Sequence, residues 1–176
     1  MAEIILMDQQ GSTAVHASGS GDDGLVRVLF ELAPDGDDPN WPPSTAEAMW
    51  AEPTGVDCAL LRNIPFYVRG VAYDDLILLK LKRAGGDDAL TFYHVIQHRG
   101  HSTYRVILQS AEDPVVFELW WKRLADIGCW YERANSALVA IDVPRGVDVH
   151  KAYQVLQRGE AEGVWSFEEG FYNSDG

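Results

Sequence analysis

Asp113-Pro114-Val115-Val116-Phe117-Glu118-Leu119-Trp120-Trp121-Lys122-Arg123-Leu124-Ala125-Asp126-Ile127-Gly128 is the stretch that decides the fold of the C-terminal part of this chain. Asp113 suits a helix N-cap and Pro114 suits the first helical position. Gly128 suits the residue that ends a helix. Between them, large apolar residues recur at spacings of three and four, at Phe117, Trp120, Leu124 and Ile127. The stretch therefore predicts an amphipathic helix with one buried face.

Short segments rich in β-forming residues flank this helix on both sides. One precedes it at 103–108, two follow as a hairpin across Asn135-Ser136, and a last one lies at 164–171. A second helix is expected to begin at the N-cap Asp148 and to end near Gly163. Its expected buried face carries Val149, Ala152, Tyr153 and Leu156. The order β-α-β-β-α-β is that of a ferredoxin-like split βαβ unit, which we predict for residues 100–176.

The N-terminal half has the pattern of a small, curled β-sheet or partial barrel. Four strands are expected, together with a long loop at 34–43 and a short helix at 44–50. The expected strands are 26–32, 60–68, 76–82 and 90–98. The sequence thus predicts an α+β protein with an acidic, flexible arm at 1–24, a β-rich part at 25–99 and the ferredoxin-like part.

Charge and hydropathy restrict the classes of function. The 176 residues carry 27 acidic and 14 basic side chains, a formal net charge of −13. This balance argues against nucleic-acid binding, which needs clustered Lys and Arg, and suits a cationic protein partner. No run approaches the ~18 apolar residues of a membrane-spanning helix. Residues 1–10 lack the basic start of a secretory signal, so a cytoplasmic protein is expected.

The strongest concentration of polar chemistry lies between Phe92 and Arg105. Gly100 permits a tight turn that would bring His98 and His101 together, and two imidazoles with a carboxylate suit a divalent metal such as zinc. An alternative is an anion site, in which guanidiniums, hydroxyls and turn amides hold the ligand. A third interpretation is a purely structural turn. The candidate ligand-binding residues are His98, Arg99, His101, Ser102, Thr103 and Arg105.

Motifs for covalent catalysis are absent from the sequence. It contains no G-x-S-x-G, no H-E-x-x-H and no phosphate-binding P-loop. We therefore predict no catalytic residues and no obligatory cofactor, and we favour a protein without enzymatic activity. Trp121 is a candidate anchor for a protein partner, because tryptophan is enriched in interface hot spots. A homodimer that joins sheets or helices of two copies is a further possibility.

Four short motifs carry a resemblance to a known family. They are Trp50-Ala51-Glu52-Pro53, Asn63-Ile64-Pro65-Phe66, Gly70-Val71-Ala72 and Gly100-His101-Ser102-Thr103-Tyr104-Arg105-Val106-Ile107. With these motifs, residues 26–171 resemble an uncharacterised bacterial family, one of the domains of unknown function. The resemblance implies a cytosolic bacterial protein. The β-α-β-β-α-β half is also similar in layout to the ribonuclease E inhibitor regulator B, an acidic protein-binding regulator.

Two functions from different classes follow from these observations. The first is a non-enzymatic binding protein of the immunity or regulator type, which inhibits or neutralises a protein partner. Its acidic surface would accelerate association with a cationic partner. The second is a small enzyme or ligand sensor that binds an anion or a metal at the turn 98–105. In that case His101 would act as an acid, a base or a ligand.

Overall fold

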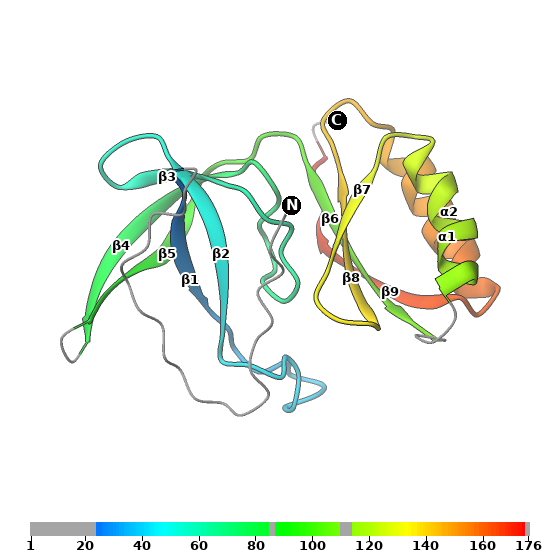
Figure 1. The fold of residues 1–176 in the computed structure, drawn as a ribbon, viewed down its shortest axis with the longest axis horizontal. Coiled ribbons are helices and arrows are strands. Elements are labelled where there is room, and N and C mark those ends of the chain that lie inside the picture. Colours follow the sequence, from blue (N-terminus) through cyan, green and yellow to red (C-terminus); the bar gives the residue numbers. More distant parts are fainter. Residues whose placement is uncertain (1–23, 85–86, 110–113, 175–176) are drawn as a thin grey trace. The chain divides into compact units, whose positions relative to one another are not determined.

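The computed structural model describes residues 24–84, 87–109 and 114–174, and it confirms the α+β class. The described residues form nine strands in two sheets and two helices, and most of the regular structure is strand (Figure 1). They divide into two compact units. The barrel unit consists of residues 24–63 and 74–98, and the sheet-and-helix unit consists of Ile64–Tyr73 together with residues 99–174. The predicted arm 1–24 lies almost wholly outside the described residues.

Five strands of the barrel unit close into a barrel in the order β1-β2-β3-β4-β5, where the sequence predicts a partial one. Consecutive strands pair antiparallel, and β5 pairs parallel with β1 to close the ring, with Val28 opposite Leu90. Alternate residues point inward, which buries Val28, Met49 and Ile77. The strands are β1 (Val26–Glu31), β2 (Ala46–Pro53), β3 (Cys58–Leu61), β4 (Leu76–Ala84) and β5 (Asp87–Gln97).

Two predicted elements of the barrel unit are wrong. Residues 46–53 form β2 instead of a helix, because Glu47, Met49 and Ala51 alternate into the interior and the strand pairs with β1 along its length. The predicted strand 60–68 ends at Leu61. Beyond it, the Asn63 side chain accepts a hydrogen bond from the Trp50 amide at 2.7 Å, and the chain leaves the barrel unit.

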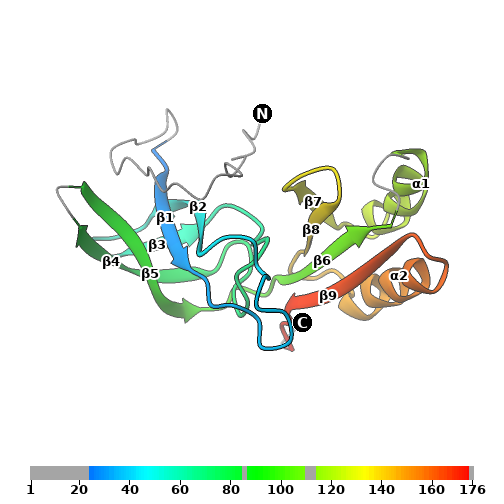
Figure 2. The same ribbon diagram turned by 90° about the horizontal axis from the view of Figure 1, so that it is seen from below.

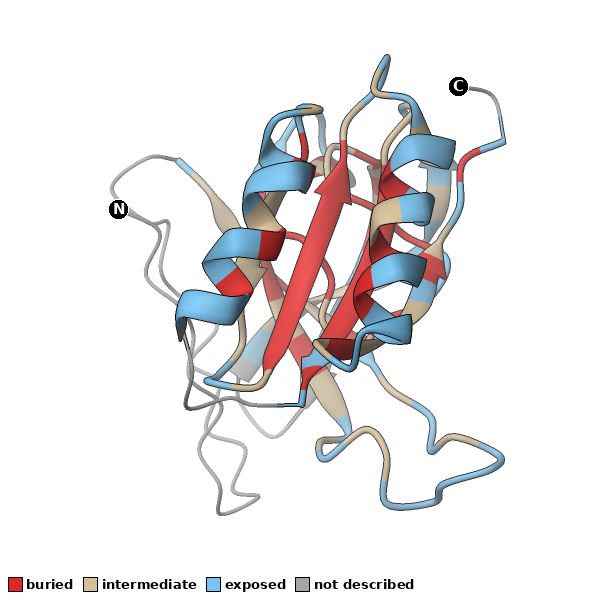
Figure 3. Cartoon of the chain, turned by 90° about the vertical axis from the view of Figure 1, so that its right-hand side faces the viewer, coloured by how far each residue is buried: buried red, intermediate tan, exposed pale blue. Residues whose placement is uncertain are grey.

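Residues 102–171 alternate strands and helices in the predicted order. The strands form one antiparallel sheet in the order β7-β8-β6-β9. Both helices lie on one face of this sheet, as Figures 2 and 3 show. Neither described helix is long and apolar enough to cross a membrane. The elements are β6 (Ser102–Leu108), α1 (Pro114–Ala125), β7 (Trp130–Arg133), β8 (Leu138–Val143), α2 (Val149–Ala161) and β9 (Trp165–Phe171).

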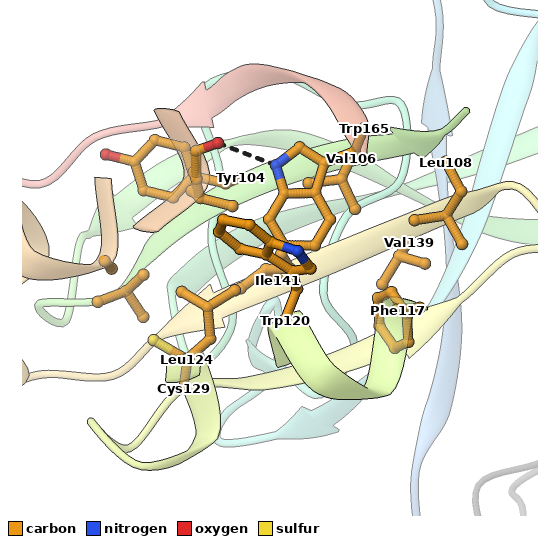
Figure 4. Close-up of a cluster of buried hydrophobic side chains, with 13 residues drawn as sticks. Tyr104, Val106, Leu108, Phe117, Trp120, Leu124, Cys129, Val139, Ile141 and Trp165 are labelled. Atoms are coloured by element: carbon orange, nitrogen blue, oxygen red, sulfur yellow. Dashed lines mark hydrogen bonds between the residues drawn. The ribbon is translucent and has the colours of Figure 1, made fainter. Parts of the chain in front are cut away.

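The core of this unit lies between the sheet and the helices (Figure 4). Tyr104 and Val106 of β6 point into it, together with the alternate residues of β8. The predicted helix stripe is buried at Phe117, Trp120 and Leu124. Trp165 of β9 donates its indole N–H to the Leu156 carbonyl of α2 at 2.9 Å. Asp148 caps α2 by accepting from the amides of His150 and Lys151. The predicted cap Asp113 lies outside the described residues.

The opposite face of the sheet is polar and covered by Ile64–Tyr73. Strand alternation turns Thr103, Arg105 and Asp142 toward this face, and each is almost completely buried. The Phe66 carbonyl accepts from Arg105 Nη1 at 3.1 Å, and the Gly70 amide donates to the Gly170 carbonyl at 3.0 Å. The covering segment itself buries Ile64, Val68, Val71 and Ala72. The candidate site described below lies on this polar face.

Candidate functional site

The structure assigns the two candidate metal histidines to different units. His98 belongs to the barrel unit, where its Nδ1 lies 2.9 Å from Oδ2 of the buried Asp75. His101 belongs to the sheet-and-helix unit, where its Nδ1 lies 2.9 Å from Oδ2 of Asp142. Each imidazole is therefore held by its own carboxylate. Among the described residues, no group of three or more His, Cys, Asp and Glu side chains is placed to hold a metal ion.

Asp142 is the centre of the polar cluster around His101. Its side chain is 0% exposed, and its carboxylate lies 3.0 and 2.9 Å from His101 Nδ1. The indole N–H of Trp130 donates to Oδ2 of the same carboxylate at 2.6 Å. The pairing of β7 with β8 places Trp130 directly opposite Asp142. The ring of Tyr73 packs edge-on against Trp130, with centroids 4.7 Å apart, and lies 5.5 Å from the His101 ring.

This arrangement sets the tautomer and the orientation of the His101 ring. An ionised carboxylate only accepts hydrogen bonds, so His101 donates from Nδ1, and the neutral ring then has Nε2 as its basic nitrogen. A carboxylate in the interior costs several kcal/mol unless its oxygens are satisfied. Here the Trp130 and His101 donors satisfy them. The His101 side chain keeps 14% of its surface exposed, whereas the Asp142 side chain is fully buried.

Three of the other predicted ligand-binding residues point into the protein. Ser102 accepts a hydrogen bond from the Asn173 amide at 3.0 Å. The Thr103 hydroxyl is buried and has no hydrogen-bond partner among the described residues. Arg105 Nε lies 3.0 Å from Oε1 of Glu168, which is also bound by Arg69 at 2.7 Å. All three side chains are almost completely buried in the sheet-and-helix unit.

Two other residues complete the turn. Arg99 is exposed, as a ligand-binding residue requires. Gly100 adopts φ +95° and is overlaid by the side chain of Arg145. A Cβ at residue 100 would lie 2.8 Å from Arg145 Cγ, so only glycine allows this close approach.

Sequence reasoning missed Asp142, Trp130, Tyr73 and Arg145 as neighbours of the turn. One signal was available for Asp142, because it is the only charged residue in the strand Leu138-Val139-Ala140-Ile141-Asp142-Val143. A lone acid in a fully buried strand needs a partner, and a histidine at the end of the neighbouring strand is a good one. Trp130, Tyr73 and Arg145 carried no comparable signal.

The remaining predicted residue, Trp121, lies on α1 and is half-buried. It stacks on Phe117 with ring centroids 6.2 Å apart, and it meets Tyr131 edge-on at 4.5 Å. Its neighbour Trp120 is the buried member of the pair. On the outer surface of the same helix, Val115 and Leu119 are 64% and 65% exposed. Trp121 as a partner anchor stays a prediction.

Comparison with known proteins gives a fold and a family. The fold is similar to that of a hypothetical protein from Neisseria gonorrhoeae, with a TM-score of 0.67 and 13% sequence identity. The match covers 84% of this chain and 96% of that one. No curated protein matches. A family model described as a domain of unknown function (DUF4265) matches residues 47–167. The chain therefore belongs to the DUF4265 family.

Proposed function

We propose that this protein binds a small molecule at His101 and exchanges a proton with it through the imidazole. The observation that carries the proposal is the buried Asp142 carboxylate, which holds His101 Nδ1 while 14% of the His101 side chain stays exposed. A carboxylate that fixes the tautomer of a histidine is the usual arrangement of a general base. The protein would act as a small enzyme or as a ligand sensor.

The second histidine–carboxylate pair offers a natural comparison. His98 and Asp75 repeat the Nδ1-to-carboxylate geometry in the barrel unit, again with a fully buried aspartate. At His101, the indole N–H of Trp130 donates to the same Asp142 carboxylate and so helps to fix its position. The two pairs can be tested with the same substitution.

His101→Asn separates binding from folding. The asparagine amide nitrogen occupies nearly the place of Nδ1, so it can still donate to Asp142, while Nε2 is lost. We expect a panel of charged small molecules to raise the melting temperature of the wild type and of His98→Asn, but not of His101→Asn. A panel that stabilises all three proteins equally, or none of them, would contradict the proposal.

A second candidate is the neutralisation of a cationic protein partner. It is favoured by the net charge of −13 together with the exposed apolar surface of α1, formed by Val115, Val116 and Leu119. Charge complementarity would attract a basic partner, and the apolar residues would supply the contact. The similarity in layout to regulator B supports this candidate by analogy. Leu119→Asp should weaken the complex with a purified basic partner at least tenfold, whereas Gln157→Asp on α2 should not. Equal affinities would exclude this surface.

We further propose that residues 102–171 are a ferredoxin-like unit. The strand order β7-β8-β6-β9 and the helices after β6 and β8 support this assignment. In such units the face away from the helices often binds ligands. In this protein the covering segment Ile64–Tyr73 contacts that face, and the Tyr73 ring at the end of the segment lies 5.5 Å from the His101 ring. An experimental structure with a different strand order would contradict the assignment.

A further inference from the structure

We infer that the ligand of the His101 site carries an oxyanion and that Arg145 binds it. The inference rests on the proposed function, because it names the chemical class that the same site would take. Arg145 follows β8 and lies against the turn that leads into His101.

The position of Arg145 is set by the backbone of Gly100. Its Cβ, Cγ and Cδ atoms lie 3.0, 2.8 and 3.1 Å from the place where a Cβ of residue 100 would stand. The pairing of β6 with β8 ends at Ser102 opposite Val143, and Gly100 and Arg145 lie just beyond that end in the two chain segments. The aliphatic stem of Arg145 is therefore held over Gly100, the residue that precedes His101 in the chain.

The guanidinium of Arg145 differs from the other described basic groups in its lack of a partner. Every other Lys or Arg whose side chain the structure describes has an ion pair, an aromatic ring contact or another polar interaction. Arg145 has none with any described residue, although acidic side chains outnumber basic ones 27 to 14. An exposed arginine whose stem is held in place and whose guanidinium has no carboxylate partner in the protein is suited to bind the oxyanion of a ligand.

The chemistry of the neighbouring groups agrees with an oxyanion. A guanidinium binds carboxylate and phosphate oxygens through paired N–H donors, and a protonated imidazole adds a further charge-assisted donor. Phosphate and carboxylate share this chemistry, and the experiment separates them.

The test titrates inorganic phosphate, and separately acetate, into the isotope-labelled protein at constant ionic strength. We expect saturable shifts of the Gly100 and His101 amide signals with at least one anion. Arg145→Gln should weaken that binding about tenfold, the loss of one charge-assisted pair. Arg158→Gln, which removes an exposed arginine of α2, is the matched control and should bind as the wild type does. Saturation with phosphate alone would identify a phosphate ligand, and saturation with acetate alone a carboxylate.

Three results would overturn the inference. They are the absence of saturable binding with both anions, an unchanged affinity in Arg145→Gln, and an equal loss in Arg158→Gln. His101→Asn separates this inference from the proposed function. If His101→Asn loses binding and Arg145→Gln keeps it, the His101 site stands without Arg145. If Arg145→Gln loses binding and His101→Asn keeps it, the anion site stands and the role of His101 fails.

Discussion

At the scale of single residues, Thr103 has a polar side chain in a buried position that does not satisfy it. Its hydroxyl is buried in β6 and has no hydrogen-bond partner among the described residues. Asp142 lies directly opposite it in the ladder, yet the carboxylate oxygens are occupied by His101 and Trp130. A buried polar group without a partner costs about 1–3 kcal/mol.

Thr103→Val should therefore stabilise the protein. Valine has nearly the shape of threonine and lacks the hydroxyl, so we expect the free energy of unfolding to rise by about 1 kcal/mol in urea denaturation. Thr91→Val is the control, because the Thr91 hydroxyl donates to the Lys80 carbonyl at 3.1 Å and its loss should not stabilise. A Thr103→Val protein less stable than the wild type would show that the hydroxyl is bonded in solution.

The two cysteines differ in how deeply they are buried, and we expect their reactivity to differ accordingly. Burial raises the pKa of the Cys129 thiol from 9.0 to about 12, and the Asp142 carboxylate adds to the rise. Cys58 is half-buried on β3. At pH 8 a thiol reagent should modify Cys58 in the native protein and leave Cys129 unmodified until the chain unfolds. Peptide mass spectrometry would measure the rate at which each cysteine is modified. Equal rates for Cys129 and Cys58 would contradict the burial of Cys129.

The raised pKa also predicts a dependence of stability on pH. Between pH 9 and about 12, the unfolded chain releases the Cys129 proton while the folded chain keeps it. The unfolded state therefore binds fewer protons, and stability falls as pH rises. Cys129→Ala should be less stable at pH 7 because it loses packing, yet its melting temperature should fall less between pH 8 and pH 10. If the melting temperatures of the two proteins fell equally between pH 8 and pH 10, the raised pKa of Cys129 would be refuted.

At the scale of elements, the packing of α2 on β9 depends on Gly159. A Cβ at this position would lie 2.5 Å from two carbons of the Trp165 indole, which is fixed by its hydrogen bond to Leu156. Helix propensity alone favours alanine by about 1 kcal/mol. We nevertheless expect Gly159→Ala to destabilise by about 1–3 kcal/mol, because the rigid ring has to move. Gln157→Ala, on the exposed side of α2, is the neutral control, and equal melting temperatures of the two variants would exclude the clash.

Elements were predictable from the sequence where their pattern was local. The α1 stripe and the Asp148 cap depend on residues a few positions apart, and both helices form as expected. The prediction of a helix at 44–50 was wrong. It rested on a local start signal, whereas residues 46–53 form β2 because they pair with β1 and β3. The end of β3 at Leu61 likewise depends on the departure of the chain from the barrel unit, which no local pattern records.

The site was predictable in part for the same reason. The cluster of histidines and arginines at 98–105 was visible as sequence neighbours, and His101 lies at the candidate site. Alternation on β6 then turned Thr103 and Arg105 toward the covered sheet face, and the covering segment makes that face an interior one. Asp142, Trp130 and Tyr73 reach His101 only through strand pairing and the segment contacts, at separations of roughly thirty to forty residues.

At the scale of the whole molecule, the units do not follow the order of the chain. Ile64–Tyr73 lies between β3 and β4 in sequence but belongs to the sheet-and-helix unit. A fragment of residues 100–176, cut at the boundary that the sequence predicts, would lack this segment. On the polar sheet face, Arg105 would lose its hydrogen bond to the Phe66 carbonyl, and Trp130 would lose its contact with the Tyr73 ring.

We expect that fragment not to fold on its own. The fragment would lack the buried apolar side chains of Ile64, Val71 and Ala72. The sheet face that carries Arg105 would then be exposed, and its polar groups would lose their partners. Near-ultraviolet circular dichroism should show the tryptophan signals of the full chain and none in the fragment. A cooperative melt of the fragment at the temperature of the full chain would contradict the role of the segment.

The most direct test of the central claim is the nitrogen NMR spectrum of the His101 imidazole, recorded with and without phosphate or acetate. Asp142 holds Nδ1, so the neutral ring should show a protonated Nδ1 and an unprotonated Nε2. One anion should shift the Nε2 signal in the wild type and in His98→Asn. An unprotonated Nδ1, or an Nε2 signal that responds to neither anion, would contradict the claim that Asp142 holds His101 ready for a ligand.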